Sequence, residues 1–188
     1  LVGKKFNNNN DLKKIGEEYI TKMKNISSKS DRTTDKLPTN FLNVGFIKLI
    51  LPNSKIIHCY RNSRDNCLSI FKNQFSSKKI KFAYDMSEVV EYYNLYNDLM
   101  KCWNNLLPDF IYNIKYESLI SNTKTVIQNL LENCDLDWTN DCLNFHNNKR
   151  RIKTSSDAQA RNKIYSNSID SWKNYEKYLN EYFVKLKN

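Results

Sequence analysis

The sequence predicts an α/β fold in which a parallel sheet is flanked by helices. Two short runs, residues 55–60 and 110–116, have the apolar and aromatic composition of strands. Stretches with helical spacing of apolar residues precede, separate and follow them. Strands that alternate with helices are typical of a parallel sheet, because each crossover is made by a helix.

Two helices are predicted before the first strand. In residues 12–23 the apolar side chains fall on one helical face, and residues 41–51 show similar spacing. The stretch between them begins with a loop rich in Ser, Lys and Thr. Pro38 disfavours a helix that continues through it, and Leu37 before it is expected to be extended.

Residues 51–71 predict a strand, a polar turn and a helix. The run 55–60 suits a strand that is buried on both faces, whereas residues 62–65 favour a turn and a helix N-cap. Arg61 follows the strand, and Ser69 lies on the helix. Such strand ends bind phosphorylated ligands in open α/β sheets, and these side chains supply a cationic fork and a hydroxyl donor. Spacing alone leaves open the alternative of a surface ion pair and a solvated serine.

The second half predicts a long helix, a strand and shorter helices. Residues 87–106 form the longest helical pattern, with an aromatic-rich apolar face expected in the core, and Pro108 ends it. The strand at 110–116 is followed by helical patterns at 122–132, 139–145 and 172–186. Residues 146–165 are polar and basic without periodicity, which is typical of a functional or disordered loop.

Composition restricts the class of partner. The 188 residues suit one domain, and the formal charge of +10 suits an anionic ligand. The charge is spread along the chain, so a generally basic surface is expected rather than a nucleic-acid stripe. We expect no specific nucleic-acid partner, and no stretch is long and apolar enough to span a membrane.

The cysteines and histidines do not form a metal motif. Five widely spaced cysteines without a CxxC pair predict free thiols in a reducing compartment, with a disulfide in a secreted protein as the alternative. His58 lies within a predicted strand, where packing or a hydrogen bond is the expected role, and His146 adds no ligand set. We therefore expect a cytoplasmic protein without a metal.

Several stretches, in order, resemble the sulfotransferase family, and the bacterial members found with tetratricopeptide repeats are the nearest in pattern, with a more distant similarity to tyrosylprotein sulfotransferases. The pieces are Asp-Lys-Leu-Pro-Thr-Asn-Phe at 35–41, Leu-Pro-Asn-Ser-Lys-Ile-Ile-His-Cys-Tyr-Arg at 51–61, Arg-Asp-Asn-Cys-Leu-Ser at 64–69, the helix from 93 to 103, Lys-Tyr-Glu-Ser-Leu at 115–119, Cys-Leu-Asn-Phe-His at 142–146, Thr-Ser-Ser-Asp-Ala-Gln-Ala-Arg at 154–161 and residues 164–175. They cover nearly the whole chain, and the resemblance implies a P-loop-like three-layer sandwich with a parallel sheet flanked by helices.

The resemblance implies a donor, 3′-phosphoadenosine 5′-phosphosulfate, and a set of residues that bind it. Arg61 and Ser69 match the pair that binds the 3′-phosphate of the donor, and Tyr116 matches a tyrosine that contacts the nucleotide. The loop that closes over the donor is matched by Ser156, Gln159 and Arg161.

The resemblance also implies two catalytic side chains. Lys36 resembles the lysine that neutralises charge on the transferring sulfuryl group, and Ser156 is the second candidate at the same atoms. Sulfuryl transfer, like phosphoryl transfer, depends on positioning and charge stabilisation. The alternative for Lys36 is a solvated surface lysine.

Two family features are absent from the sequence. There is no 5′-phosphosulfate loop of the Pro-Arg-Ser-Gly-Thr-Thr type, and no glutamate base between such a loop and Lys36. Residues 1–188 are therefore expected to be a partial sulfotransferase domain, inactive by itself, that belongs to an enzyme acting on an acceptor hydroxyl or amine. The alternative of another class is a basic, non-catalytic module that binds polyanions or nucleic acid.

Overall fold

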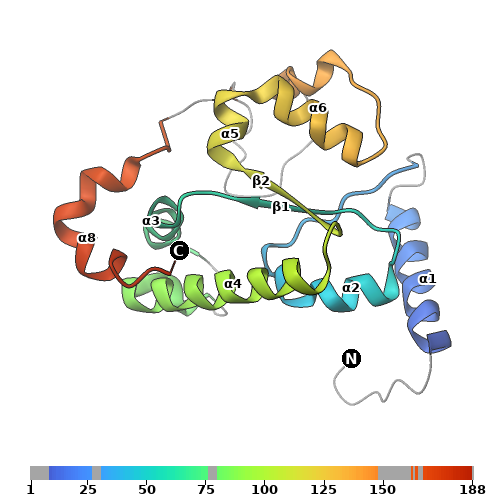
Figure 1. The fold of residues 1–188 in the computed structure, drawn as a ribbon, viewed down its shortest axis with the longest axis horizontal. Helices are drawn as coiled ribbons and strands as arrows, with labels where there is room; N and C mark the ends of the chain where they lie inside the picture. The colour runs from blue at the N-terminus through green and yellow to red at the C-terminus, as the bar shows by residue number, and fades with distance from the viewer. Residues whose placement is uncertain are drawn as a thin grey trace. The chain divides into compact units, whose positions relative to one another are not determined.

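A computed structural model describes residues 9–26, 31–75, 80–147, 162, 164 and 167–187. Helices dominate this part of the chain (Figure 1). In order, the elements are α1 (Asn9–Ile26), η1 (Pro38–Asn43), α2 (Val44–Ile50), β1 (Ile56–Tyr60), α3 (Ser63–Lys72), η2 (Lys81–Tyr84), α4 (Met86–Leu106), β2 (Ile111–Lys115), α5 (Tyr116–Ser121), α6 (Thr123–Asn133), η3 (Asn140–Cys142), η4 (Phe145–Asn147), η5 (Ser171–Tyr175) and α8 (Glu176–Phe183), where η denotes a 3₁₀ helix.

The sheet in the described part of the chain consists of β1 and β2, which run parallel (Figure 1). The predictions of a parallel sheet with flanking helices and of both strands are confirmed. The prediction that β1 is buried on both faces is wrong. Side chains alternate along a strand, and His58 contacts Tyr96 of α4, whereas Ile57 on the opposite face is 42% exposed.

The predicted helices differ from the observed ones mainly at their ends. The helix predicted at 41–51 begins as η1, and the one predicted at 172–186 begins as η5. Residues 139–145 form 3₁₀ turns, and α5 directly after β2 is an additional helix. Most of the irregular stretch 146–165 lies outside the described residues.

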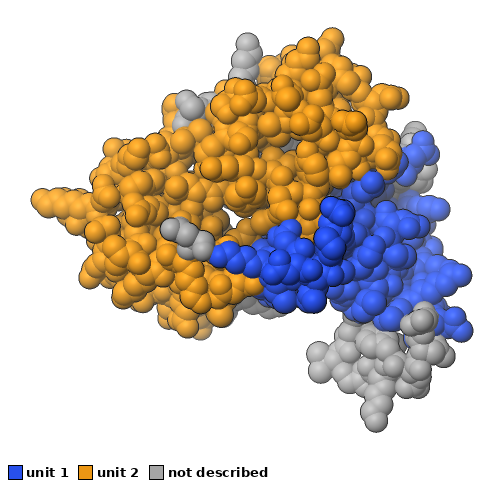
Figure 2. Space-filling view, in the orientation of Figure 1, with its two compact units in different colours: residues 1–56, 99–110 blue, residues 57–98, 111–188 orange. Residues whose placement is uncertain are grey.

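The chain divides into two compact units, coloured in Figure 2. Unit 1 comprises residues 1–56 and 99–110, and unit 2 comprises residues 57–98 and 111–188. The expectation of one partial domain stays a prediction.

Unit 2 is built on an apolar cluster that joins α3, α4 and the C-terminal elements. Val89 of α4 and Cys67 of α3 are fully buried, and Phe183 is 2% exposed. The predicted aromatic face of α4 is partly confirmed, since Tyr93 packs against this cluster. Leu95, an apolar residue within the predicted helix 87–106, is 63% exposed, so the buried face does not extend to it.

Unit 1 packs α1 against α2, and Gly16 of α1 lies close to the backbone at the end of α2. A Cβ added at Gly16 would lie 1.9 Å from the Ile50 carbonyl oxygen. In the same unit, the Trp103 indole N–H donates to the Phe41 carbonyl at 2.8 Å. This unit therefore depends on a glycine where two helix backbones meet.

We expect Gly16→Ala to lower the free energy of unfolding by about 1–3 kcal/mol, because the added methyl group has no space. In an open helix the same change would stabilise by about 1 kcal/mol, since alanine is the better helix former. Chemical denaturation measures the difference. Lys22→Ala, at an exposed position of α1, is the control and should stay within about 0.5 kcal/mol; a stabilised Gly16→Ala variant would contradict the close packing.

The structure contains the five cysteines as free thiols, and Cys67 and Cys134 are buried. Among the described residues, none of the helices has the length and apolar character to cross a membrane.

Candidate functional site

Two polar turns meet at the carboxyl ends of β1 and β2. His58 Nδ1 lies 2.7 Å from Asn113 Oδ1, and the Asn62 N–H donates to Glu117 Oε1 at 2.8 Å. In both pairs the two residues are 55 positions apart in the sequence. Arg61 and Tyr116 share this separation, and the guanidinium carbon lies 5.8 Å from the ring centroid. The two strands thus run in register and end at the same edge.

The turn after β1 is fixed by a helix cap. Asn62 is the N-cap of α3, and its Oδ1 accepts the N–H groups of Arg64 at 3.0 Å and Asp65 at 3.2 Å. An N-cap side chain supplies an acceptor for N–H groups that the first helical turn leaves unpaired. The predicted turn and cap are confirmed, and the cap determines where Arg61 leaves the strand.

Arg61 lies along the side of α3 toward Ser69. Its Nη2 donates to the backbone carbonyl of Asp65 at 2.6 Å. In an α-helix, the carbonyl of residue i faces the amide of residue i+4, so this carbonyl faces the amide of Ser69. The chain therefore turns after β1 so that the guanidinium lies against the first turns of α3, and the role predicted for the Ser69 hydroxyl stays a prediction.

Tyr116 joins the same group from the end of β2. It is the first residue of α5, and its hydroxyl lies 3.0 Å from Ser168 Oγ. Its ring lies close to the Arg61 guanidinium, where a cation–π contact is favourable. Three of the predicted binding residues, Arg61, Ser69 and Tyr116, thus lie in unit 2, and Arg61 and Tyr116 are in contact.

Lys36 lies in unit 1, before η1. The side chain is exposed and makes no ion pair or hydrogen bond with the described part of the chain. The neighbouring Asp35 carboxylate accepts the Tyr19 hydroxyl at 2.7 Å. Burial, and then the hydrogen bond to Asp35 and its charge, raise the pKa of Tyr19 to about 12. The residue before Lys36 is therefore tethered to α1.

The other predicted residues, Ser156, Gln159 and Arg161, lie outside the described residues. Their predicted roles stay predictions.

Sequence reasoning missed two carboxylates at the site. Glu117 accepts the Asn62 N–H through Oε1, whereas its Oε2 is buried without a partner among the described residues. Asp65 is 1% exposed and accepts hydrogen bonds from the segment 170–172. A signal for Asp65 exists, because it lies three residues before the buried Leu68 on the same helical face, and a charge on a buried face needs partners.

A network of neutral groups lies beneath β1. His58 contacts Asn113 through Nδ1 and the Tyr96 hydroxyl through Nε2. Burial lowers the pKa of His58, against the smaller opposing effect of the Asn113 hydrogen bond, and burial raises the pKa of Tyr96 and of Cys59. Each shift favours the neutral form, so the pair of His58 and Tyr96 and the Cys59 thiol add no charge next to Arg61.

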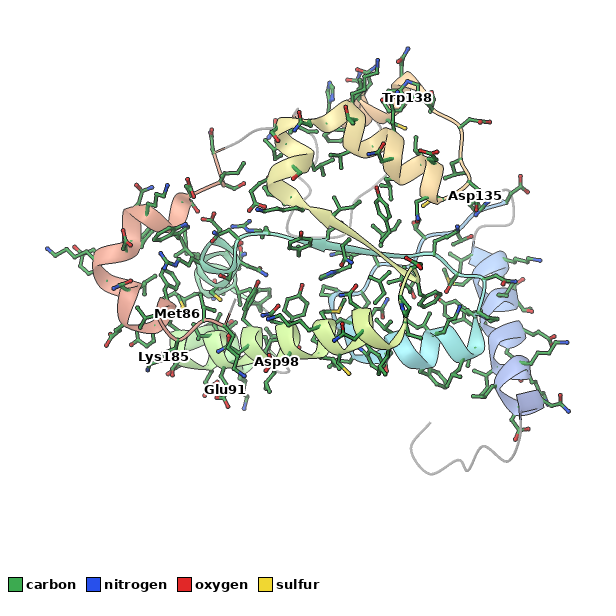
Figure 3. All side chains as sticks on the ribbon, in the orientation of Figure 1. Met86, Glu91, Asp98, Asp135, Trp138 and Lys185 are labelled. Carbon is green, nitrogen blue, oxygen red and sulfur yellow. The ribbon has the colours of Figure 1, made fainter. Side chains whose placement is uncertain are left out.

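A hollow of ≈ 290 Å³ lies next to the strand ends, and its lining includes Tyr60 and Lys115, the neighbours of Arg61 and Tyr116 in the chain. A second hollow, of ≈ 310 Å³, is lined by residues that include Glu91 and Lys185, whose side chains lie near one another in Figure 3. None of the predicted site residues lines this second hollow.

No group of side chains suited to a metal ion is found among the described residues.

The fold and the site define an α/β protein with a polar cluster, in which one guanidinium lies with two carboxylates, at the carboxyl ends of two parallel strands. Residues 9–140 match the model of the sulfotransferase family, so the chain belongs to that family. This confirms the resemblance seen in the sequence. Arg61, Ser69, Tyr116 and Lys36 lie within the matched residues, whereas Ser156, Gln159 and Arg161 lie beyond them.

Two further proteins are similar to this chain, one in sequence and one in structure. An uncharacterized protein of Aquifex aeolicus (strain VF5) is 37% identical over 170 residues, which are 89% of this chain and 22% of that protein. A solved structure, the sulfotransferase domain from the curacin biosynthetic pathway, has a similar fold, with a TM-score of 0.54 at 18% identity over 85% of this chain and 60% of that one. The chain thus spans about a fifth of the length of the curated relative.

Proposed function

We propose that this chain is the donor-binding part of a sulfotransferase, which moves a sulfuryl group from 3′-phosphoadenosine 5′-phosphosulfate to an acceptor hydroxyl or amine. One observation carries the proposal: in a member of this family, Arg61 meets Tyr116 at the carboxyl ends of two parallel strands and donates to the Asp65 carbonyl, one helical turn before Ser69 on α3. Open α/β sheets bind their ligands at this edge.

The 3′-phosphate of the donor is assigned to Arg61 and Ser69. A guanidinium fork makes charge-assisted hydrogen bonds to phosphate, and a hydroxyl adds one more donor. The N-terminus of α3 adds favourable electrostatics for an anion. Tyr116 is assigned to the nucleotide, and Ser156, Gln159 and Arg161 are assigned to the loop over the donor.

Transfer itself is assigned to Lys36 and Ser156 at the sulfuryl group. The acceptor atom forms a bond to sulfur while the bond from sulfur to the bridging oxygen breaks, and the leaving phosphate takes the electron pair. A cation near the bridging oxygen stabilises the charge that develops there. The proton of the acceptor goes to a base that we do not assign within residues 1–188.

The proposal includes the wider architecture. We assign residues 1–188 to a three-layer, P-loop-like sulfotransferase domain, of which they form the part that binds the 3′-phosphate. The free thiols fit a reducing compartment such as the cytoplasm. The reaction needs no metal, because lysine and arginine side chains supply the positive charge.

Calorimetric titration of the chain with adenosine 3′,5′-bisphosphate and with adenosine 5′-monophosphate tests the proposal. We expect the bisphosphate to bind at least about tenfold more tightly, because hydrogen bonds to a charged group contribute about 1.5–3 kcal/mol. Equal affinities for the two nucleotides would contradict the assignment of a 3′-phosphate site. Salt-sensitive RNA binding without this preference would instead favour the polyanion-binding module.

A further inference from the structure

Asp65 is the buried charged residue of the described part of the chain, at 1% exposure. Its Oδ2 accepts the Asp170 N–H at 2.8 Å, and its Oδ1 accepts the Ser171 hydroxyl at 2.9 Å and the Trp172 N–H at 3.0 Å. All three donors come from one short segment more than 100 residues later in the chain. A buried carboxylate is stable only while such donors are present, so Asp65 ties this segment to the start of α3.

The same residue also holds Arg61. The Asp65 backbone carbonyl accepts Arg61 Nη2 at 2.6 Å, and Tyr116, beside the guanidinium, bonds to Ser168 at 3.0 Å. Ser168 lies just before the donors that bind the Asp65 carboxylate. The contacts thus form a closed ring, named here the Asp65 ring, which runs from Arg61 to Asp65, to residues 168–172, to Tyr116 and back to Arg61.

Two further contacts fasten the segment to α3. The guanidinium carbon of Arg64 lies 4.3 Å from the centroid of the Trp172 ring, and Arg64 Nη1 lies 3.8 Å from Glu176 Oε1. Asp170 has a φ of 60°, a left-handed conformation uncommon outside glycine. Such a conformation persists where surrounding contacts enforce it. The hydrogen bond from the Asp170 N–H to the Asp65 carboxylate is one of these contacts.

We propose that Asp65 is a positioning residue for the 3′-phosphate site. Its carboxylate fixes residues 168–172 against α3, and the closed ring then holds Arg61 and Tyr116 in one arrangement before the nucleotide binds. An arginine side chain without such support samples many rotamers, and binding then has to order it, which lowers the affinity. This inference rests on the proposed function, because it concerns the same site.

Asp65→Asn tests the positioning role. The amide keeps the size of the side chain and one acceptor, but its NH₂ group replaces Oδ2 and faces the Asp170 N–H, donor against donor. We expect calorimetry to show adenosine 3′,5′-bisphosphate binding about tenfold more weakly, because fewer molecules hold the competent arrangement. Ser171→Ala removes one donor alone, so a smaller loss in the same direction is expected, and it tests the role even where Asp65→Asn does not fold.

Two controls separate positioning from general stability. Asp85→Asn makes the same atomic change at the start of α4, where Asp85 Oδ1 accepts the N–H groups of Ser87 at 2.7 Å and Glu88 at 3.2 Å, and it should bind as the wild type does. Val44→Ala removes apolar contacts at a buried position of unit 1, which holds no residue of the Asp65 ring, and below its melting temperature it should also keep wild-type affinity. Equal weakening by Val44→Ala, or unchanged affinity in both ring variants, would overturn the positioning role.

Combining Asp65→Asn with Arg61→Ala completes the test. If Asp65 acts through Arg61, its substitution changes affinity by less than about twofold once Arg61 is absent, whereas full additivity overturns the role. If Arg61→Ala weakens bisphosphate binding but neither Asp65→Asn nor Ser171→Ala does, the positioning role is wrong and the proposed function stands. Unchanged affinity in Arg61→Ala overturns the proposed function, and the positioning role with it.

Discussion

Arg61→Ala is expected to weaken binding of adenosine 3′,5′-bisphosphate by about 100-fold. The guanidinium is the permanently charged group of the cluster at the strand ends, and loss of a fork that binds a phosphate removes charge-assisted hydrogen bonds worth about 3 kcal/mol. Calorimetric titration measures the change. Affinity for adenosine 5′-monophosphate should fall far less, because the lost contacts are those to the 3′-phosphate.

Two arginine variants serve as controls for this result. Arg61→Lys keeps the charge but not the planar fork, so we expect an intermediate loss of about tenfold. Arg32→Ala, at an exposed position of unit 1, removes the same charge elsewhere and should leave affinity within about twofold. If Arg61→Ala and Arg32→Ala have the same small effect, the affinity comes from the general positive charge rather than from this site.

Lys36→Ala is expected to reduce kcat by about 100- to 1000-fold while donor affinity changes by less than about threefold. An exposed ammonium group that contacts only the transferring sulfuryl group stabilises the transition state more than the bound donor, and removal of one such stabilising donor has effects of this size. The measurement is sulfuryl transfer by the protein that contains this chain, with donor affinity determined separately. This prediction depends on the proposed function.

Its controls are two further lysine variants. Lys36→Arg retains the charge and should recover part of the turnover, whereas Lys22→Ala changes an exposed lysine on α1 and should leave kcat unaltered. Unchanged turnover in Lys36→Ala would identify the side chain as a solvated surface lysine, the alternative that the sequence left open.

The sequence by itself predicted most of the local structure and the family. Apolar periodicity located α1, α4, α6 and both strands, and Pro108 marked the end of α4. Asn62 was recognisable as a cap, because side-chain capping depends on residues that are near in sequence. The motifs around Lys36, Arg61 and Tyr116 identified the family that the comparison confirms.

Only the tertiary structure showed how residues far apart in the chain meet. The exposed face of β1 could not be read from its composition, since isoleucine suits a strand whether its face is covered or open. The contact of Arg61 with Tyr116 required the register of two strands, and the donors to Asp65 came from residues 170–172, at the start of the last predicted helix and more than 100 residues away in the chain. Periodicity and capping report neighbours within a few residues, whereas a buried carboxylate finds its partners only when the chain folds back on itself.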